Sequence, residues 1–118
     1  MKRFLFIMRR PPHEGCGLRE SLDMLMTVAA FDQPVRVLFL DDGVFALKSG
    51  QRPEVLGLKP VLPLFAALDI YGVEGLWVEQ ESLAQRGLSA ESLALPTQGI
   101  RRAEVAGFVA WADIVVSG

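Results

Sequence analysis

The residues best suited to chemistry in this 118-residue chain begin with a cysteine and a histidine in one short segment. The segment RRPPHEGCG, residues 9–17, contains the only histidine, His13, and the only cysteine, Cys16. Cys16 directly precedes a helical pattern, and the unpaired amides at a helix N-terminus favour a thiolate. Cys16, assisted by His13, is therefore a candidate nucleophile. The alternative is a loop cysteine without a chemical role, because no third residue that would orient the pair is evident.

Two more polar groups follow apolar runs of strand length. Asp41-Asp42-Gly43 follows VRVLFL. This pair resembles a magnesium site superficially, but a turn is the simpler interpretation, with Asp42 bonding to the local backbone and Gly43 relieving backbone crowding. The segment LWVEQESLAQRGL, residues 76–88, places Glu79 at a strand-to-helix turn. Arg86 is expected to bond to loop carbonyls or to a carboxylate such as Glu79 in a structural role, and a catalytic role is the alternative.

The sequence does not favour a bound cofactor or metal ion. Gly15 and Gly17 lie where many α/β proteins bind nucleotides. The segment lacks the hydroxyl-rich loop of flavodoxins and the Lys-Ser/Thr ending of a P-loop. We therefore predict no cofactor and no metal, and keep a flavin or nucleotide module as a minor alternative.

Composition narrows the class of protein. Hydrophobic residues make up 51% of the chain and the mean hydropathy is +0.32, yet no apolar run reaches the roughly 20 residues of a membrane span. The surplus of apolar residues indicates partner subunits or a buried parallel sheet. Twelve basic and fourteen acidic residues, without a basic block, argue against direct nucleic-acid binding. The single cysteine fits a reducing compartment, so we expect a cytoplasmic protein. The basic and apolar start, MKRFLFIMRRPP, predicts a buried strand, not a signal peptide.

Apolar runs alternate with helical patterns along the whole chain. The predicted strands are residues 4–8, 35–40, 75–78, 93–95 and 113–117, and the predicted helices are residues 18–29, 62–68, 81–86 and 101–111. This alternation predicts one α/β domain, residues 1–118, with a three-layer α/β/α architecture and a five-stranded, mostly parallel, flavodoxin-like sheet. We expect the strand order 2-1-3-4-5, with a crevice near strands one and three, and a left-handed cap at Gly87.

Four aromatic residues are large enough to anchor a core or an interface. They are Phe65, Trp77, Phe108 and Trp111. Most aromatic residues at such positions belong to the core, and the remainder are favoured where subunits meet.

Several ordered motifs together resemble the TusC/DsrF family of the DsrE-like superfamily. The start has Pro12-His13, Gly17, Arg19-Glu20 and Leu22-Asp23, with Leu18 inserted; Asp42-Gly43-Val44-Phe45, Leu47 and Gly50-Gln51-Arg52-Pro53 follow; Leu76-Trp77-Val78, Ser82-Leu83 and Arg86-Gly87-Leu88 complete the pattern. In sulfur-carrying members of these families the strand-to-helix turn reads C-x(6)-R-G, and the matching position here is Glu79. A carboxylate cannot hold a persulfide.

The resemblance implies a non-catalytic structural subunit of a TusBCD-type sulfur-relay complex. Such a complex is a heterohexamer with two copies each of TusB-like, TusC-like and TusD-like subunits, and a downstream sulfur acceptor docks to it. It supports persulfide transfer toward 2-thiolation of the tRNA wobble uridine. Two alternatives remain open: Cys16 carries the persulfide in place of the cysteine missing at position 79, or the chain is a DsrF-type subunit in sulfur oxidation.

Overall fold

The computed structural model describes residues 2–10, 17–49 and 62–117. It contains one five-stranded sheet in which every strand pairing is parallel. The strands are β1 (Phe4–Met8), β2 (Val35–Phe39), β3 (Leu76–Glu79), β4 (Gln98–Ile100) and β5 (Ile114–Ser117). The predicted α/β class and parallel sheet are therefore confirmed, and β1 has the predicted bounds.

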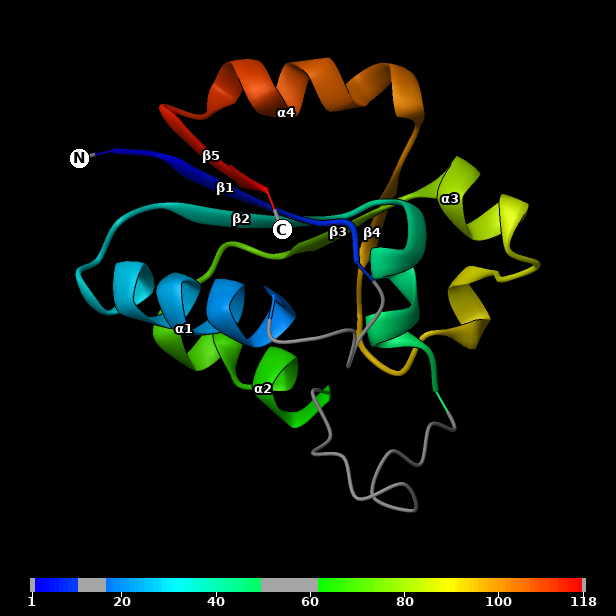
Figure 1. Cartoon of the computed structure of the whole chain (residues 1–118), viewed down its shortest axis with the longest axis horizontal. Helices are drawn as coiled ribbons and strands as arrows, with labels where there is room; N and C mark the ends of the chain where they lie inside the picture. The colour runs from blue at the N-terminus through cyan, green and yellow to red at the C-terminus, as the bar shows by residue number, and fades with distance from the viewer. Residues whose placement is uncertain (1, 11–16, 50–61, 118) are drawn as a thin grey trace.

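The predicted strand order is wrong. The observed order is β4-β3-β2-β1-β5, so β2 lies between β1 and β3 (Figure 1). The first four strands are laid down successively in one direction, and only β5 returns to the far side of β1. Hydrophobic periodicity identifies strands but does not state on which side of its predecessor each strand pairs. Strands one and three are therefore not neighbours, as the expected crevice would require. The carboxyl ends of β1, β2 and β3 instead lie side by side in that order.

The fourth strand was also misplaced. β4 is Gln98–Ile100, whereas the segment 93–95 lies outside the sheet and contributes an isolated antiparallel bridge between Leu93 and Lys48. Leu93 and Leu95 are half-buried against the core. Because an exposed residue separates these two leucines, the sequence shows the alternation that is typical of a strand. The backbone of this segment is nevertheless irregular.

Helices cover both faces of the sheet, as the three-layer prediction required. Helices α1 (Gly17–Ala30) and α2 (Leu62–Ala66) lie on one face and α4 (Val105–Trp111) lies on the other (Figure 1). Successive strand residues point to opposite faces, so β1 contributes to two cores. Phe6 and Met8 join the core under α1, while Leu5 and Ile7 join the smaller core under α4.

Helix α1 carries the β1–β2 crossover and is held by one apolar stripe. Leu22, Leu25 and Ala29 recur at spacings of three and four and are buried. Full burial of each leucine contributes about 1.5–3 kcal/mol relative to exposure. The helix ends before Asp32, whose φ of 60° reverses the chain toward β2.

Two predicted helices are interrupted by 3₁₀ turns. The segment expected to be one helix over 62–68 forms α2 and then η3 (Leu68–Tyr71), which ends at Gly72 with φ 84°. The segment 101–111 forms η5 (Arg102–Glu104) followed by α4. The short helix α3 (Gln80–Gln85) stops as predicted before Gly87, whose φ of 68° is left-handed. No helix in the described ranges is long and apolar enough to cross a membrane.

The aromatic anchors divide between the two sides of the sheet. Phe65 is buried and meets Phe39 edge to face, with ring centroids 5.1 Å apart. Trp77, Phe108 and Trp111 are half-buried between the sheet and α4. The core assignment is therefore confirmed for Phe65, and the other three rings form the seat of α4.

Candidate functional site

Glu79 is the last residue of β3 and lies at the edge where parallel strands end together. Its register partner on β4 is Ile100, and strand alternation places its side chain on the same face as Trp77. Only 3% of the residue is exposed. A carboxylate so deeply buried requires partners, because an unpaired buried charge costs several kcal/mol.

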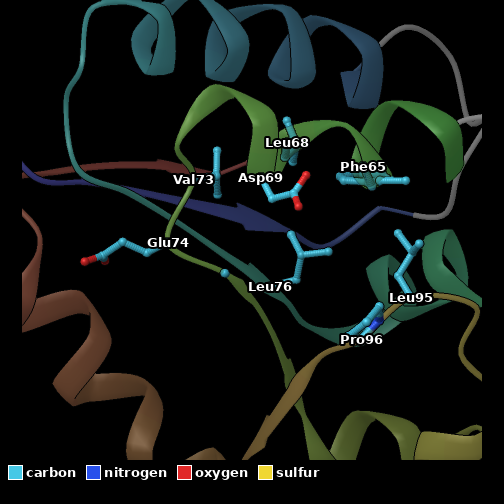
Figure 2. A pocket seen from close by; sticks show the side chains of 10 residues that line it. Phe65, Leu68, Asp69, Val73, Glu74, Leu76, Leu95 and Pro96 are labelled. Carbon is cyan, nitrogen blue, oxygen red and sulfur yellow. The ribbon is translucent and has the colours of Figure 1, made fainter.

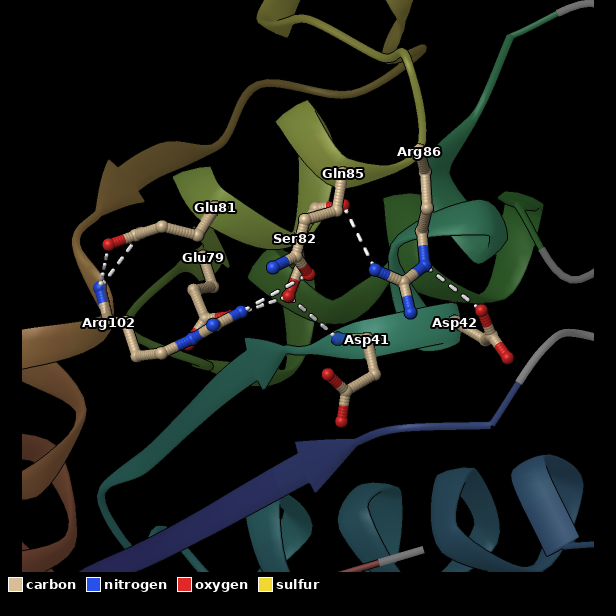
Figure 3. Close-up of polar contacts among 8 residues, drawn as sticks. All are labelled: Asp41, Asp42, Glu79, Glu81, Ser82, Gln85, Arg86 and Arg102. Carbon is tan, nitrogen blue, oxygen red and sulfur yellow. Dashed lines mark hydrogen bonds and ion pairs between the residues drawn. The ribbon is translucent and has the colours of Figure 1, made fainter.

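Two donors converge on one oxygen of Glu79. The hydroxyl of Ser82 donates to Oε1 over 2.5 Å, and Nη2 of Arg102 donates to the same atom over 2.9 Å (Figure 3). Ser82 is itself fully buried, and its Oγ accepts the backbone N–H of Asp41 at 2.9 Å. The hydroxyl therefore joins the turn after β2 to the end of β3.

The electrostatics of this cluster keep Glu79 ionised. Burial acts to raise the pKa of Glu79, but hydrogen bonds from Arg102 and Ser82 and the charges of Arg102 and Arg9 oppose burial and prevail, so the pKa lies below its ordinary value of 4.5. The same hydrogen bond with Glu79 raises the pKa of Arg102. A carboxylate stabilised in this way is a weak base, and its oxygen cannot store sulfur as a persulfide.

Arg102 was not anticipated from the sequence. Its backbone N–H also donates to both carboxylate oxygens of Glu81, at 2.9 and 3.0 Å, so the chain leaving β4 is fastened to the first turn of α3. The available signal was its position two residues after Ile100, the strand partner of Glu79. Because the fourth strand was predicted at residues 93–95, Arg102 was placed too far along the chain to be connected with Glu79.

Arg86 links helix α3 to the turn that follows β2. Its Nε lies 2.9 Å from Oδ1 of Asp42, and its Nη1 donates to the carbonyl oxygen of Ser82 over 3.2 Å (Figure 3). The prediction that Arg86 bonds a carboxylate is confirmed, but its carbonyl partner, Ser82, lies in helix α3 and not in a loop. The suggested carboxylate, Glu79, was wrong, since that position is occupied by Arg102. The side chain of Asp42 makes this ion pair in place of the local backbone bonds that were expected.

Gly43 permits the close approach of two strand ends. It belongs to the 3₁₀ helix η1 (Asp41–Leu47), which packs against the end of β1. A Cβ at this position would collide with the carbonyl oxygen of Met8. The expectation that Gly43 relieves backbone crowding is therefore confirmed, and the crowding comes from β1.

His13 and Cys16 lie outside the described residues, so their role remains a prediction. The described residue nearest to them on the β1 side is Arg10, two residues after the strand ends. Among described residues, no group of three His, Cys, Asp or Glu side chains is arranged to hold a metal ion. The chemistry of the described site is thus that of a closed ion pair.

One cavity borders η3 and another borders α3, and Glu79 lines neither of them. One, of about 230 Å³, has an apolar wall that includes Phe65, Leu68 and Leu76, with Asp69 and Glu74 also lining it (Figure 2). It lies at the opposite end of β3 from Glu79. The other, of about 310 Å³, is lined by Val78 and Leu83 among others and lies on the opposite face of β3 from the carboxylate.

Comparison with known proteins identifies the family. The model of the DsrE/DsrF-like family matches residues 2–117. A homologue of Protein TusC from Pseudomonas aeruginosa is 45% identical over 94 residues, which cover 80% of this chain and 79% of the relative. The intracellular sulfur oxidation protein DsrF of Allochromatium vinosum is 39% identical over 93 residues, covering 79% of this chain and 68% of the relative.

A solved structure supports the same fold. The crystal structure of the ychN protein from E. coli superposes with a TM-score of 0.86 over the full length of both chains, at 19% sequence identity. The family match spans nearly the whole sequence, and the ordered motifs around Glu79 and Arg86 lie within it. The chain therefore belongs to the DsrE/DsrF-like family.

Proposed function

We propose that this protein is a non-catalytic structural subunit of a sulfur-relay complex of the TusBCD type. Relatives named TusC and DsrF, at 45% and 39% identity, support membership of such a complex. Its partners are TusB-like and TusD-like chains, two copies of each joining two copies of this chain. The complex works in the cytoplasm, and a downstream sulfur acceptor docks to it.

The observation that carries this proposal is the burial of the Glu79 carboxylate and its pairing within the chain. In carrier chains of related families a cysteine occupies this position and accepts the outer sulfur of a donor persulfide, whose own sulfur leaves as a thiolate. Here the position holds a carboxylate that is 3% exposed and bound by Ser82 and Arg102. Such a group is neither accessible nor nucleophilic toward sulfur. The reactive cysteine therefore belongs to the TusD-like partner, and this chain contributes binding surface.

The destination of the sulfur is the 2-position of the tRNA wobble uridine. The greater identity to a TusC homologue than to DsrF favours this destination over sulfur oxidation. A DsrF-type role is the second candidate. Reconstitution with the downstream sulfur acceptor and tRNA, followed by mass analysis of the nucleosides, distinguishes the two, because a sulfur-oxidation subunit would not support thiolation.

The test is a reconstituted complex that carries Glu79→Gln. The substitution keeps the shape of the side chain and removes its charge. We expect the purified complex to keep its composition and to transfer sulfur at a rate within about twofold of the wild type. Loss of transfer from a complex that remains fully assembled would show that Glu79 takes part in the chemistry, and the proposal would be abandoned.

A parallel experiment addresses Cys16, the other candidate carrier. The complex containing Cys16→Ser is exposed to a persulfide donor, and each subunit is weighed by mass spectrometry. We expect the added sulfur, one atom per site, on the partner subunit in both the variant and the wild type. A sulfur adduct on Cys16 of the wild-type chain, with loss of transfer in the variant, would make this chain a carrier.

A further inference from the structure

The cavity beside η3 has an apolar base. It lies at the amino end of β3, between η3 and the segment that leads into β4 (Figure 2). Its apolar lining comes from α2, from η3, from the start of β3 and from the segment before β4. The lining residues are Phe65, Leu68, Val73, Leu76, Leu95 and Pro96, of which the first three are buried. We call this space the η3 cavity.

The size of the η3 cavity limits what it can hold. Its volume is about 230 Å³. An apolar cavity of about 150 Å³ accommodates benzene, and sites for drug-sized ligands occupy roughly 300–1,000 Å³. The η3 cavity therefore suits a compact molecule with on the order of ten non-hydrogen atoms. A larger ligand would have to displace the buried side chains at the base.

Two carboxylates also line the cavity, and they differ in their partners. Oε2 of Glu74 accepts a hydrogen bond from Nε of Arg36 over 2.8 Å, and Figure 2 shows the Glu74 side chain directed away from the apolar lining. Asp69 belongs to η3, and its carboxylate lies on the cavity side (Figure 2). Within residues 2–10, 17–49 and 62–117, no group forms an ion pair or hydrogen bond with the Asp69 carboxylate. The cavity thus offers one carboxylate to a ligand.

Backbone hydrogen bonds hold the walls of the cavity in place before any ligand binds. The chain leaves η3 through Gly72, whose φ is 84°, and the N–H of Val73 donates to the carbonyl oxygen of Leu68 over 3.2 Å. The N–H of Glu74 donates to the carbonyl oxygen of Val35, the first residue of β2, over 3.0 Å. These bonds fix η3 relative to the sheet. A site with preformed walls loses little conformational entropy when a ligand binds.

We infer that the η3 cavity binds a small organic amine in its ammonium form, with a compact hydrocarbon body. The hydrocarbon covers the apolar lining, and the ammonium group donates hydrogen bonds to the Asp69 carboxylate. A neutral molecule of the same shape gains only the apolar contact, whereas an anion is repelled by Asp69 and Glu74. Because Asp69 is exposed, water screens the ion pair and its contribution to affinity is moderate. This inference does not depend on the sulfur-relay role.

The test compares three ligands of nearly equal size. Cyclohexylmethylamine, cyclohexylmethanol and cyclohexanecarboxylate share one hydrocarbon body and are positive, neutral and negative at pH 7. Each is titrated into the ¹⁵N-labelled chain, and the amide chemical shifts of the residues that line the η3 cavity report binding. We expect the amine to bind about three- to tenfold more tightly than the alcohol. The carboxylate should bind more weakly than the alcohol.

Two substitutions separate the effect of the charge from that of the space. Asp69→Asn keeps the shape of the side chain and removes its charge, so the amine should bind only as tightly as the alcohol, whose affinity should not change. Ala66→Leu adds bulk to the lining at the end of α2 and should weaken both ligands by about tenfold or more. The matched control is Asp23→Asn, which removes an exposed carboxylate of α1 outside the cavity and should change neither affinity. Circular dichroism confirms that each variant is folded.

Three results would overturn the inference. The first is the absence of shift changes around the η3 cavity at amine concentrations up to about 10 mM. The second is equal affinity of the wild type for the amine and the alcohol. The third is a preference for the amine that survives Asp69→Asn.

A lysine side chain of a partner subunit carries the same chemistry, and a competition experiment distinguishes it from a free amine. The chain is assembled with TusB-like and TusD-like partners in the presence and absence of cyclohexylmethylamine. We expect equal assembly in both cases, and we expect the assembled complex to bind the amine as the isolated chain does. An amine that prevents assembly, or a complex that no longer binds it, would show that a partner fills the cavity. The free-ligand inference would then be overturned, while the proposed relay role would stand.

Discussion

Arg102 Nη2 lies 2.9 Å from Glu79 Oε1 and so joins the residue that ends β3 to the turn that follows β4. Glu79 is buried, whereas the side chain of Arg102 is half-exposed and reaches the carboxylate from the solvent side. The Arg102 side chain therefore lies between the Glu79 carboxylate and solvent at the ends of β3 and β4.

Glu79→Gln should lower the free energy of unfolding by about 1–2 kcal/mol. The amide keeps the shape of the carboxylate but loses the charge-assisted hydrogen bonds from Ser82 and Arg102. Urea denaturation monitored by fluorescence measures the change. The matched control is Glu104→Gln, whose carboxylate forms an exposed pair with Arg101 and should change stability by less than about 0.5 kcal/mol. Equal effects of the two substitutions would contradict the buried ion pair.

The contribution of Glu79 should disappear in acid. Because the folded-state pKa of Glu79 lies below the ordinary value of 4.5, its stabilising effect is present above that value and is lost as the pH falls through the folded pKa. The difference in urea midpoint between wild type and Glu79→Gln should therefore be constant near pH 7 and shrink below pH 4.5. A difference that grows on acidification would mean that the folded-state pKa of Glu79 is raised.

Gly43→Ala should destabilise the fold by about 1–3 kcal/mol, because the added methyl group collides with the carbonyl oxygen of Met8 at the end of β1. Gly107→Ala is the matched control. Open space surrounds that position, and alanine in a helix is favoured over glycine, so the substitution should stabilise the fold by about 0.5–1 kcal/mol. Thermal and urea unfolding of both variants gives the comparison. Destabilisation of similar size at both positions would show that the close contact with Met8 is unimportant.

Arg36→Lys should loosen α4 although it keeps the positive charge. The guanidinium of Arg36 lies 4.1 Å from the ring centroid of Trp111 and 5.3 Å from that of Trp77, and its Nε donates to Glu74 over 2.8 Å. A planar guanidinium stacks on rings and donates at its edge at the same time, which an ammonium group cannot do. We expect a weaker near-ultraviolet dichroism signal from the tryptophans and a loss of about 1 kcal/mol. An unchanged tryptophan signal would mean that the stacking does not hold α4 in place.

Much of the local structure could be predicted because short-range patterns determine it. The uninterrupted apolar run of β1 and the apolar stripe of α1 are each set by burial on known faces. Gly87 is left-handed because helix α3 ends at Gln85, with Arg86 as its C-cap, and the chain must turn there. The position of Glu79 at a strand end follows in the same way from the apolar residues before it.

Long-range relationships could not be predicted from such patterns. The pairing of β2 with both β1 and β3 depends on the path of each crossover over the sheet, which no single segment encodes. β4 is only three residues long and two of them are exposed, so it gives almost no apolar signal, whereas the half-buried Leu93 and Leu95 give a false one. Arg102 was missed because its role depends on the register of β4 against β3.

The arrangement around Glu79 also makes position 79 difficult to convert into a sulfur-carrying site. If cysteine replaced Glu79, its sulfur would lie two bonds nearer the backbone than the carboxylate oxygen does. The hydroxyl of Ser82 would then lose its acceptor in a fully buried place, and Arg102 would keep a positive charge without its counter-ion. A working carrier cysteine at position 79 would thus require coordinated changes at several positions.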